Sequence, residues 1–157
     1  DQVQLPDGEA SVREWIDHPG AAAVVPVFED GDTVLLRQYR YPAQKVFVEV
    51  PAGKFDEEGE DPEDLARREL EEETGWRAEH LRYLGGYYPC IGYSSEIIHF
   101  FLARGLFPGQ SSLEREEFVE PFRVSFEEAA AMVRRGEIED MKSMVAILLV
   151  EAALKED

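Results

Sequence analysis

Residues 21–28, with the sequence AAAVVPVF, are the feature that most constrains the fold of this chain. They contain no polar side chain, whereas a strand with one face in water alternates apolar and polar residues. A short, continuous apolar run of this kind is typical of a strand that is buried on both faces. We therefore expect a sheet that other elements cover on both sides.

The segments on either side of this strand predict the other elements. Residues 1–17 predict N-terminal strands in a hairpin, because Pro6-Asp7-Gly8 is a turn signal between two alternating stretches. Further strands are predicted at residues 33–41, 45–53, 80–89, 96–106 and 122–124. A capping box of Ser125 and Glu128 begins a helix that reaches about Arg135, and a last helix covers about 140–154. This order predicts an α/β fold with helices on both faces of a mixed sheet.

The length and the cysteine content indicate one domain in a reducing compartment. The chain has 157 residues without an internal repeat or a low-complexity linker, so we expect a single domain over residues 1–157. Its single cysteine, Cys90, excludes an intramolecular disulfide, which favours the cytoplasm. No apolar run approaches the ~20 residues of a membrane span. We therefore expect no membrane partner.

The formal net charge of −18 restricts the class of partner. A nucleic-acid backbone needs a basic surface, so we expect no nucleic-acid partner. A small anionic substrate stays compatible with this charge if cations or local arginines lie between protein and substrate. Solubility, or adaptation to a salty cytoplasm, explains the acidity equally well.

A helix with unusual acidity is predicted between Asp61 and Gly75. Asp61 is a suitable N-cap, Pro62 suits the first helical position and Gly75 suits the C-terminal cap. Four glutamates lie in its second half: Glu69, Glu71, Glu72 and Glu73. At about 100° per residue, Glu69, Glu72 and Glu73 share the side of the apolar residues, and Glu71 points away to water.

Carboxylates that face the protein are costly unless they are paired or bound to a metal. Hard cations such as Mg2+ take oxygen ligands, so the three inward glutamates predict a divalent-cation site. The alternative is pairing with arginines, for example between Arg68 and Glu72 at i,i+4. The helix pattern leaves both interpretations open.

At these residues the chain resembles the Nudix hydrolases, whose box reads G-x5-E-x7-R-E-U-x-E-E-x-G-U. Every fixed position from Glu60 to Gly75 is met, Trp76 stands at the last U, and six residues rather than five separate Gly53 from Glu60. The box therefore covers residues 53–76. The segments HPGAAAVVPV, LLRQYRYP, VEVPAGK and PCIGYSSE extend the resemblance to the ADP-ribose and nucleoside-diphosphate-sugar pyrophosphatase branch over nearly the whole chain.

This resemblance implies a Nudix-type α/β/α sandwich and a homodimer. It also implies Mg2+-dependent hydrolysis, with Mn2+ as a substitute, of the pyrophosphate bond in ADP-ribose or another nucleoside diphosphate sugar. The products are a nucleoside monophosphate and a sugar phosphate. Two alternatives remain: the same chemistry on a dinucleotide, coenzyme A or a nucleoside triphosphate, and a non-catalytic sensor. The intact glutamates argue against the sensor.

The resemblance also implies roles for individual residues. The metal ligands are Glu69, Glu72, Glu73 and the backbone carbonyl of Ala52, and Arg68 holds the glutamates by ion pairing. The general base comes from the loop EREEFVE, where Glu117 is the best match, with Glu114, Glu116 and Glu120 as substitutes. Two alternatives remain: a box glutamate such as Glu72 serves as the base, or the loop is only a solvated run of charges.

Candidate substrate contacts lie on several other predicted segments. Arg40 and Arg37 are candidate phosphate clamps, and Arg40 is the better match. Glu49 is expected to face the metal site or the sugar. Trp15 is expected either to stack on the base or to pack in a core or an interface. Glu96 and Ser95 lie in a loop expected to face the site, where a plain turn is the alternative.

Overall fold

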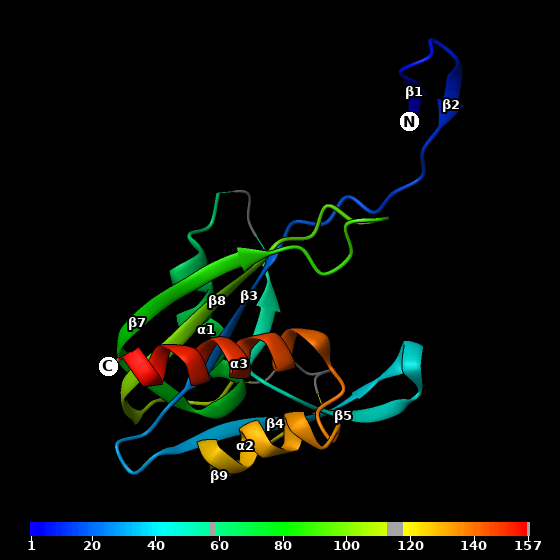
Figure 1. Ribbon diagram of the computed structural model, residues 1–157. Coiled ribbons are helices and arrows are strands. Elements are labelled where there is room, and N and C mark those ends of the chain that lie inside the picture. Colours follow the sequence, from blue (N-terminus) through cyan, green and yellow to red (C-terminus); the bar gives the residue numbers. More distant parts are fainter. Residues whose placement is uncertain (57–58, 113–117, 157) are drawn as a thin grey trace.

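The computed structural model describes residues 1–56, 59–112 and 118–156 (Figure 1). The strands are β1 (Gln2–Gln4), β2 (Ala10–Val12), β3 (Ala21–Pro26), β4 (Asp32–Arg40), β5 (Lys45–Glu49), β6 (Ala52–Lys54), β7 (Trp76–Tyr87), β8 (Ile98–Pro108) and β9 (Val119–Ser125). The helices are α1 (Pro62–Thr74), α2 (Phe126–Arg134) and α3 (Met141–Glu156), with a 3-10 turn at Tyr41–Ala43. In the part of the chain that is described, no helix is long and apolar enough to cross a membrane.

The strands form two main sheets and a separate hairpin. One sheet has the order β6-β3-β8-β7, in which β3 and β8 are parallel and the other pairs are antiparallel. The second sheet has the antiparallel order β5-β4-β9. The predicted hairpin is confirmed as β1 and β2, which project from the body of the molecule (Figure 1).

The predicted strand at residues 45–53 is wrong, because two strands in different sheets occupy this segment. β5 pairs with β4, whereas β6 pairs with β3. Pro51 lies at the break, and it has no backbone N–H to donate to a continuous ladder. Its carbonyl accepts a hydrogen bond from the backbone N–H of Val24 at 2.9 Å, so the chain crosses to the first sheet here.

The expectation of a sheet covered on both faces is confirmed. Every residue of β3 is buried. Ala22 and Val24 pack with the apolar residues of α1, and on the opposite face Ala23 and Val25 pack in the core that contains α2 and α3. The sheet therefore lies between helical layers, as the Nudix-type α/β/α sandwich requires (Figure 1).

The ends of the acidic helix are also confirmed. The Asp61 carboxylate accepts a hydrogen bond from the backbone N–H of Glu63 at 2.8 Å. At the other end Gly75 has a φ of 73°, and its N–H donates to the carbonyl of Glu71 at 2.8 Å. Residues with a side chain adopt this left-handed conformation at a cost, so Gly75 ends α1 where the sequence predicts.

Thr33, in the middle of β4, provides a test of the packing of the core. Its side chain is completely buried, and among the described residues its hydroxyl oxygen is a buried polar atom without a hydrogen-bond partner. Such an unsatisfied group costs roughly 1–3 kcal/mol. We expect Thr33→Val to raise the free energy of unfolding by ~1 kcal/mol, as measured by urea denaturation.

The matched control is Thr33→Ser, which keeps the hydroxyl and removes the methyl group. It is expected to lower the stability, because it leaves a cavity without relieving the unsatisfied oxygen. A Thr33→Val variant that is less stable than the wild type would show that the hydroxyl has a partner in solution.

Candidate active site

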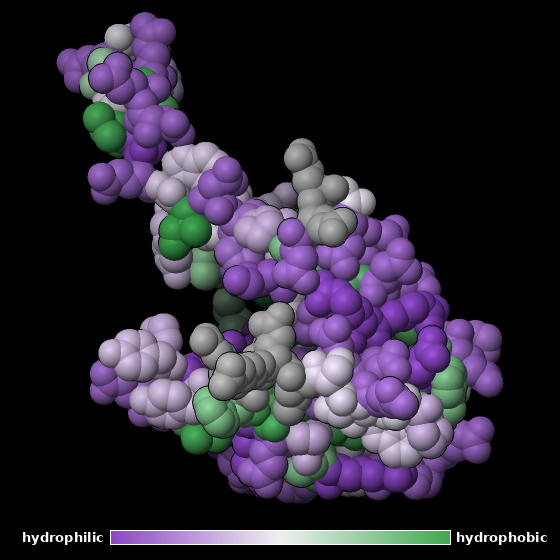
Figure 2. Space-filling view, turned by 180° about the vertical axis from the view of Figure 1, so that it is seen from behind, coloured by the Kyte–Doolittle hydropathy of each residue, from purple (hydrophilic) through white to green (hydrophobic). Residues whose placement is uncertain are grey.

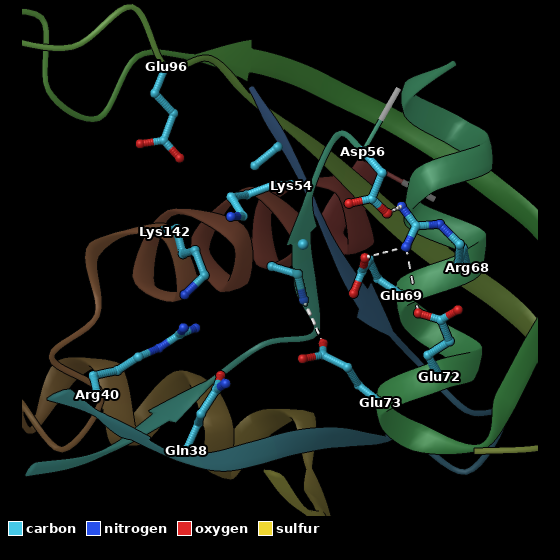
Figure 3. Close-up of a pocket in the computed structure, with 13 residues that line it drawn as sticks. Gln38, Arg40, Lys54, Asp56, Arg68, Glu69, Glu72, Glu73, Glu96 and Lys142 are labelled. Carbon is cyan, nitrogen blue, oxygen red and sulfur yellow. Dashed lines mark hydrogen bonds and ion pairs between the residues drawn. The ribbon is translucent and has the colours of Figure 1, made fainter. Parts of the chain in front are cut away.

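A cavity of about 460 Å³ lies between α1, the strand β6, the end of β4 and the first turn of α3 (Figure 3). Residues far apart in the sequence meet in it. Its polar lining residues are Gln38, Arg40, Lys54, Asp56, Arg68, Glu69, Glu72, Glu73, Glu96 and Lys142. Figure 3 shows Glu69, Glu72 and Glu73 on one side of this cavity, with Arg68 beside them, and Arg40 and Lys142 on the opposite side.

Glu69, Glu72 and Glu73 form what we call the acidic wall. They project from α1 toward the cavity (Figure 3), as the helical pattern predicts. Glu69 and Glu73 are only 8% and 3% exposed, whereas Glu72 is partly exposed. Burial of carboxylates to this degree requires compensation by hydrogen bonds or by positive charge.

Glu71 lies outside the cavity, as expected, but the expectation that it simply faces water is wrong. Its carboxylate accepts a hydrogen bond from the backbone N–H of Gln110 at 3.2 Å. It also lies 3.4 Å from the guanidinium of Arg77. Glu71 therefore ties the end of α1 to the segment that follows β8.

The strand β6, which precedes the box helix, fits closely around the buried glutamates. The backbone N–H of Ala52 donates to the Glu73 carboxylate at 2.9 Å. At the next residue, Gly53, a Cβ atom would lie only 2.1 Å from a carboxylate oxygen of Glu69. The position needs glycine because the backbone and the carboxylate approach each other so closely.

Arg68 compensates the negative charge of the acidic wall. One guanidinium nitrogen lies 3.1 Å from Glu69 and 3.6 Å from Glu72. The other lies 2.9 Å from Asp56 and 3.3 Å from Glu60. Burial lowers the pKa of Arg68, but these carboxylates outweigh burial, and the net effect is a raised pKa. The predicted pair of Arg68 and Glu72 is thus part of a larger network.

The donor atoms of the acidic wall fit a hard divalent cation. Three carboxylates and the nearby carbonyl of Ala52 supply oxygen ligands, the kind that Mg2+ prefers. The missing side chain at Gly53 leaves room for the Glu69 carboxylate beside this carbonyl. Within the described ranges, the acidic, histidine and cysteine side chains form no preassembled group of three ligands. Arg68 here provides the positive charge that a cation would supply.

Arg40, Lys54 and Lys142 form what we call the basic wall (Figure 3). Arg40 makes a bidentate pair with Glu49, with both nitrogen–oxygen distances at 2.7 Å. Lys142 donates to the same Glu49 carboxylate and, at 2.8 Å, to Asp140. Two cations at the cavity therefore share one carboxylate, whose residue is only 2% exposed.

The ion pair of Glu49 and Arg40 stabilises the charged form of both residues. Burial raises the pKa of Glu49, but the hydrogen bonds and charges of Arg40 and Lys142 outweigh burial and hold the pKa below its ordinary value. The hydrogen bond to Glu49 in turn raises the pKa of Arg40. Glu49 and Arg40 are therefore both charged at neutral pH, and their ion pair in the basic wall is formed before any anion binds.

Two predicted substrate contacts occupy other places. Glu49 does not border the cavity, because it lies behind Arg40 and Lys142 and is fully occupied by them. Arg37 also lies away from the cavity, because alternate residues of β4 face opposite sides and the cavity side holds Gln38 and Arg40. The guanidinium of Arg37 packs over the Phe122 ring, 3.9 Å from the ring centroid.

The loop after β7 supplies one residue to the cavity. Glu96 borders it, and its carboxylate lies 3.9 Å from the ring nitrogen Nε2 of His18. Ser95 instead faces residues 13–20, which join β2 to β3 and which we call the N-terminal arm. Its hydroxyl accepts a hydrogen bond from the backbone N–H of His18 in this arm at 2.8 Å. Ser95 therefore holds the arm against the loop and does not border the cavity.

Trp15 lies on the N-terminal arm and is 48% exposed. Its indole N–H donates to the side chain of Asp1 at 2.6 Å. It does not border the cavity in the single chain. Of the candidate bases, Glu117, Glu114 and Glu116 lie outside the described residues, and Glu120 lies on β9, 3.6 Å from Arg37.

Sequence reasoning missed four polar residues that border the cavity: Gln38, Lys54, Asp56 and Lys142. The position of Gln38, two residues before Arg40 on the same strand, was a usable signal. Lys54 follows Gly53 directly, and Asp56 comes two residues after Lys54. Lys142 had no local signal, because 93 residues separate it from Glu49 in the sequence.

The similarity to known proteins agrees with this geometry. Residues 17–146 match the NUDIX domain family. The chain belongs to the Nudix family. It is 43% identical over 149 residues to the ADP-ribose pyrophosphatase of Bacillus subtilis (strain 168), which covers 94% of this chain and 80% of that protein. The resemblance to Nudix hydrolases is thereby confirmed, and the chain is a Nudix hydrolase.

A further relative and a solved structure are also similar to this chain. The chain is 40% identical over 159 residues to the methanol dehydrogenase activator of Bacillus methanolicus, with 99% of this chain and 85% of that protein covered. A crystal structure of an ADP compounds hydrolase superposes with a TM-score of 0.84 over 99% of this chain and 84% of that one. At 23% sequence identity this structure supports the Nudix fold alone.

The close approach at Gly53 gives a prediction about cation binding. We expect Gly53→Ala to displace the flexible end of Glu69 and to weaken Mn2+ binding about tenfold or more, with little loss of stability. Calorimetric titration with Mn2+ measures the affinity, and thermal denaturation measures the stability. Gly92→Ala is the control, because a Cβ atom at Gly92 has no neighbour within 4 Å. Unchanged Mn2+ affinity in Gly53→Ala would exclude Glu69 as a ligand.

Proposed function

We propose that this Nudix hydrolase is a Mg2+-dependent pyrophosphatase that cleaves ADP-ribose or another nucleoside diphosphate sugar. Mn2+ is a suitable substitute for Mg2+. The products are a nucleoside monophosphate and a sugar phosphate. The similarity to the Bacillus subtilis ADP-ribose pyrophosphatase supports this substrate class.

The observation that carries the proposal is the opposition of an acidic and a basic wall across one cavity (Figure 3). A diphosphate ester carries two negative charges, so the basic wall attracts it directly. The acidic wall repels it unless cations lie between carboxylates and phosphates. A cavity with both walls therefore suits a diphosphate that binds together with divalent cations.

Each wall has a distinct role in the proposed reaction. A cation held by Glu69, Glu72, Glu73 and the carbonyl of Ala52 would neutralise the diphosphate and lower the pKa of a bound water. Arg68 keeps the carboxylates of Glu69 and Glu72 oriented by ion pairing.

On the opposite side, Arg40 and Lys142 hold the phosphate oxygens, and Glu96 contacts the substrate or a cation at the rim of the cavity. Water adds to one phosphorus, the bond from this phosphorus to the bridging oxygen breaks, and the other phosphate leaves with that oxygen. The proton of the water passes to a general base, for which Glu117 is our candidate.

The same two walls accept other diphosphates, so a panel of substrates tests the proposal. The protein is incubated with Mg2+ and ADP-ribose, other sugar nucleotides, dinucleotides, coenzyme A and nucleoside triphosphates, and the products are separated by anion-exchange chromatography. We expect AMP and ribose 5-phosphate from ADP-ribose. Faster cleavage of a dinucleotide, coenzyme A or a triphosphate would show that this compound, and not a nucleoside diphosphate sugar, represents the substrate class. No cleavage of any compound would favour a sensor.

Glu72 and Glu71 provide a matched pair of variants. Glu72→Gln removes one charge from the acidic wall, and we expect turnover to fall by ~100-fold or more while the fold stays intact. Glu71→Gln makes the same substitution one residue away, outside the cavity, and is expected to keep the wild-type turnover. Steady-state kinetics and circular dichroism measure both. Equal turnover in Glu72→Gln and the wild type would show that Glu72 binds no catalytic cation.

We also propose a homodimer in the cytoplasm. The projecting hairpin supports the dimer, because Val12 at its end and Trp15 and Ile16 directly after it are exposed. Figure 2 shows hydrophobic surface on the projecting part of the molecule. A second chain would cover these residues, and it would give Trp15 a surface for stacking or packing. Sedimentation measures the oligomeric state. The single Cys90 supports the location, since the cytoplasm is reducing.

A further inference from the structure

The first turn of α3 carries a polar network that extends to both walls of the cavity. Asp140 precedes the helix, and Lys142 and Ser143 lie in its first turn. One oxygen of the Asp140 carboxylate accepts three hydrogen bonds: from Lys142 at 2.8 Å, from the Ser143 backbone N–H at 3.1 Å and from the Ser143 hydroxyl at 2.5 Å. Asp140 itself does not border the cavity, whereas Lys142 does.

Lys142 occupies an unfavourable place for a lysine. Its side chain is only 17% exposed, so the ammonium group has lost much of its water. It also lies at the positive end of the helix dipole, where cations are destabilising. The Glu49 and Asp140 carboxylates compensate both costs. A position that needs this much compensation indicates that the ammonium group serves the cavity rather than the stability of the helix.

Ser143 links the same turn to the acidic wall. It is fully buried, and its hydroxyl oxygen accepts a hydrogen bond from the backbone N–H of Val50 at 2.9 Å. Because the hydroxyl hydrogen points to Asp140, the oxygen lone pair is free to face Val50. Two residues after Val50, the backbone N–H of Ala52 donates a hydrogen bond to the Glu73 carboxylate. Asp140 thus orients Lys142 directly and the segment 50–52 through Ser143.

We propose that Asp140 is a positioning residue of this enzyme, which acts on the phosphates through Lys142. This inference rests on the proposed function, because it assigns a task to a residue behind the same cavity. Asp140 and Glu49 hold the ammonium group between them, so that its remaining N–H points into the cavity. Without the charge of Asp140, Glu49 is the one carboxylate that pairs with Lys142, whose side chain then samples other rotamers and binds the diphosphate less tightly.

The test uses Asp140→Asn, because asparagine is as good a helix N-cap as aspartate but carries no charge. We expect KM for ADP-ribose to rise about five- to tenfold, with kcat within about twofold, since the lost interaction serves binding of substrate and transition state alike. The melting temperature is expected to stay close to that of the wild type. Ser125→Ala is the control for a lost cap: it lowers the melting temperature and leaves KM unchanged.

A double-mutant cycle tests whether Asp140 acts through Lys142. Lys142→Met is expected to raise KM by itself. Adding Asp140→Asn to it is expected to change KM by less than about twofold, because the asparagine side-chain oxygen still accepts the hydrogen bonds of Ser143. If Asp140→Asn leaves KM unchanged in an active enzyme, or raises it equally in the Lys142→Met background, the proposal is overturned.

A second readout needs no substrate and separates this proposal from the proposed function. Lysines are labelled with trace acetic anhydride, and mass spectrometry compares Lys142 with Lys155, which is exposed on the same helix. We expect Asp140→Asn to increase the relative labelling of Lys142 severalfold. If the wild type cleaves no substrate, the proposed function fails, and unchanged labelling then also overturns the positioning role of Asp140.

Discussion

The concentration of negative charge on one side of α1 is the constraint on which the rest of the structure depends. Three carboxylates on the protein side of one helix repel each other and lose water. Three features of this protein stabilise the carboxylates in that position: the charge of Arg68, the backbone N–H of Ala52 and the absence of a side chain at Gly53. The strand β6 is therefore fitted closely to the glutamates of α1.

On the opposite side of the cavity, positive charges are brought together around a buried carboxylate. Arg40 and Lys142 are two cations that approach one place, and the buried Glu49 holds them together. Each wall thus brings together groups of one charge, with partners of the other charge behind or beside them. The chain has a net charge of −18, and the face in Figure 2 is mostly hydrophilic. In spite of this negative charge, the basic residues of the cavity face one place where an anion can bind.

Features that arise within one element were predictable from the sequence. The caps of α1 and the inward side of its glutamates depend on helical periodicity alone, and the double burial of β3 depends on its apolar run. Features that need two distant segments were not predictable. The pair of Lys142 and Glu49 forms only when the first turn of α3 meets the end of β5, and it leaves Glu49 behind the cavity. Strand alternation places Arg37 and Arg40 on opposite sides of β4, but it does not tell which side borders the cavity, because distant segments form the cavity.

The central claim is that the acidic wall holds divalent cations against a bound diphosphate. Crystals grown with Mn2+ and a non-hydrolysable methylene analogue of ADP-ribose test this claim directly, because anomalous scattering locates manganese independently of the protein. The account predicts an anomalous peak beside the carboxylates of Glu69, Glu72 and Glu73, with the analogue between this peak and Arg40. Manganese bound elsewhere, or an analogue bound with no peak at these glutamates, would contradict it.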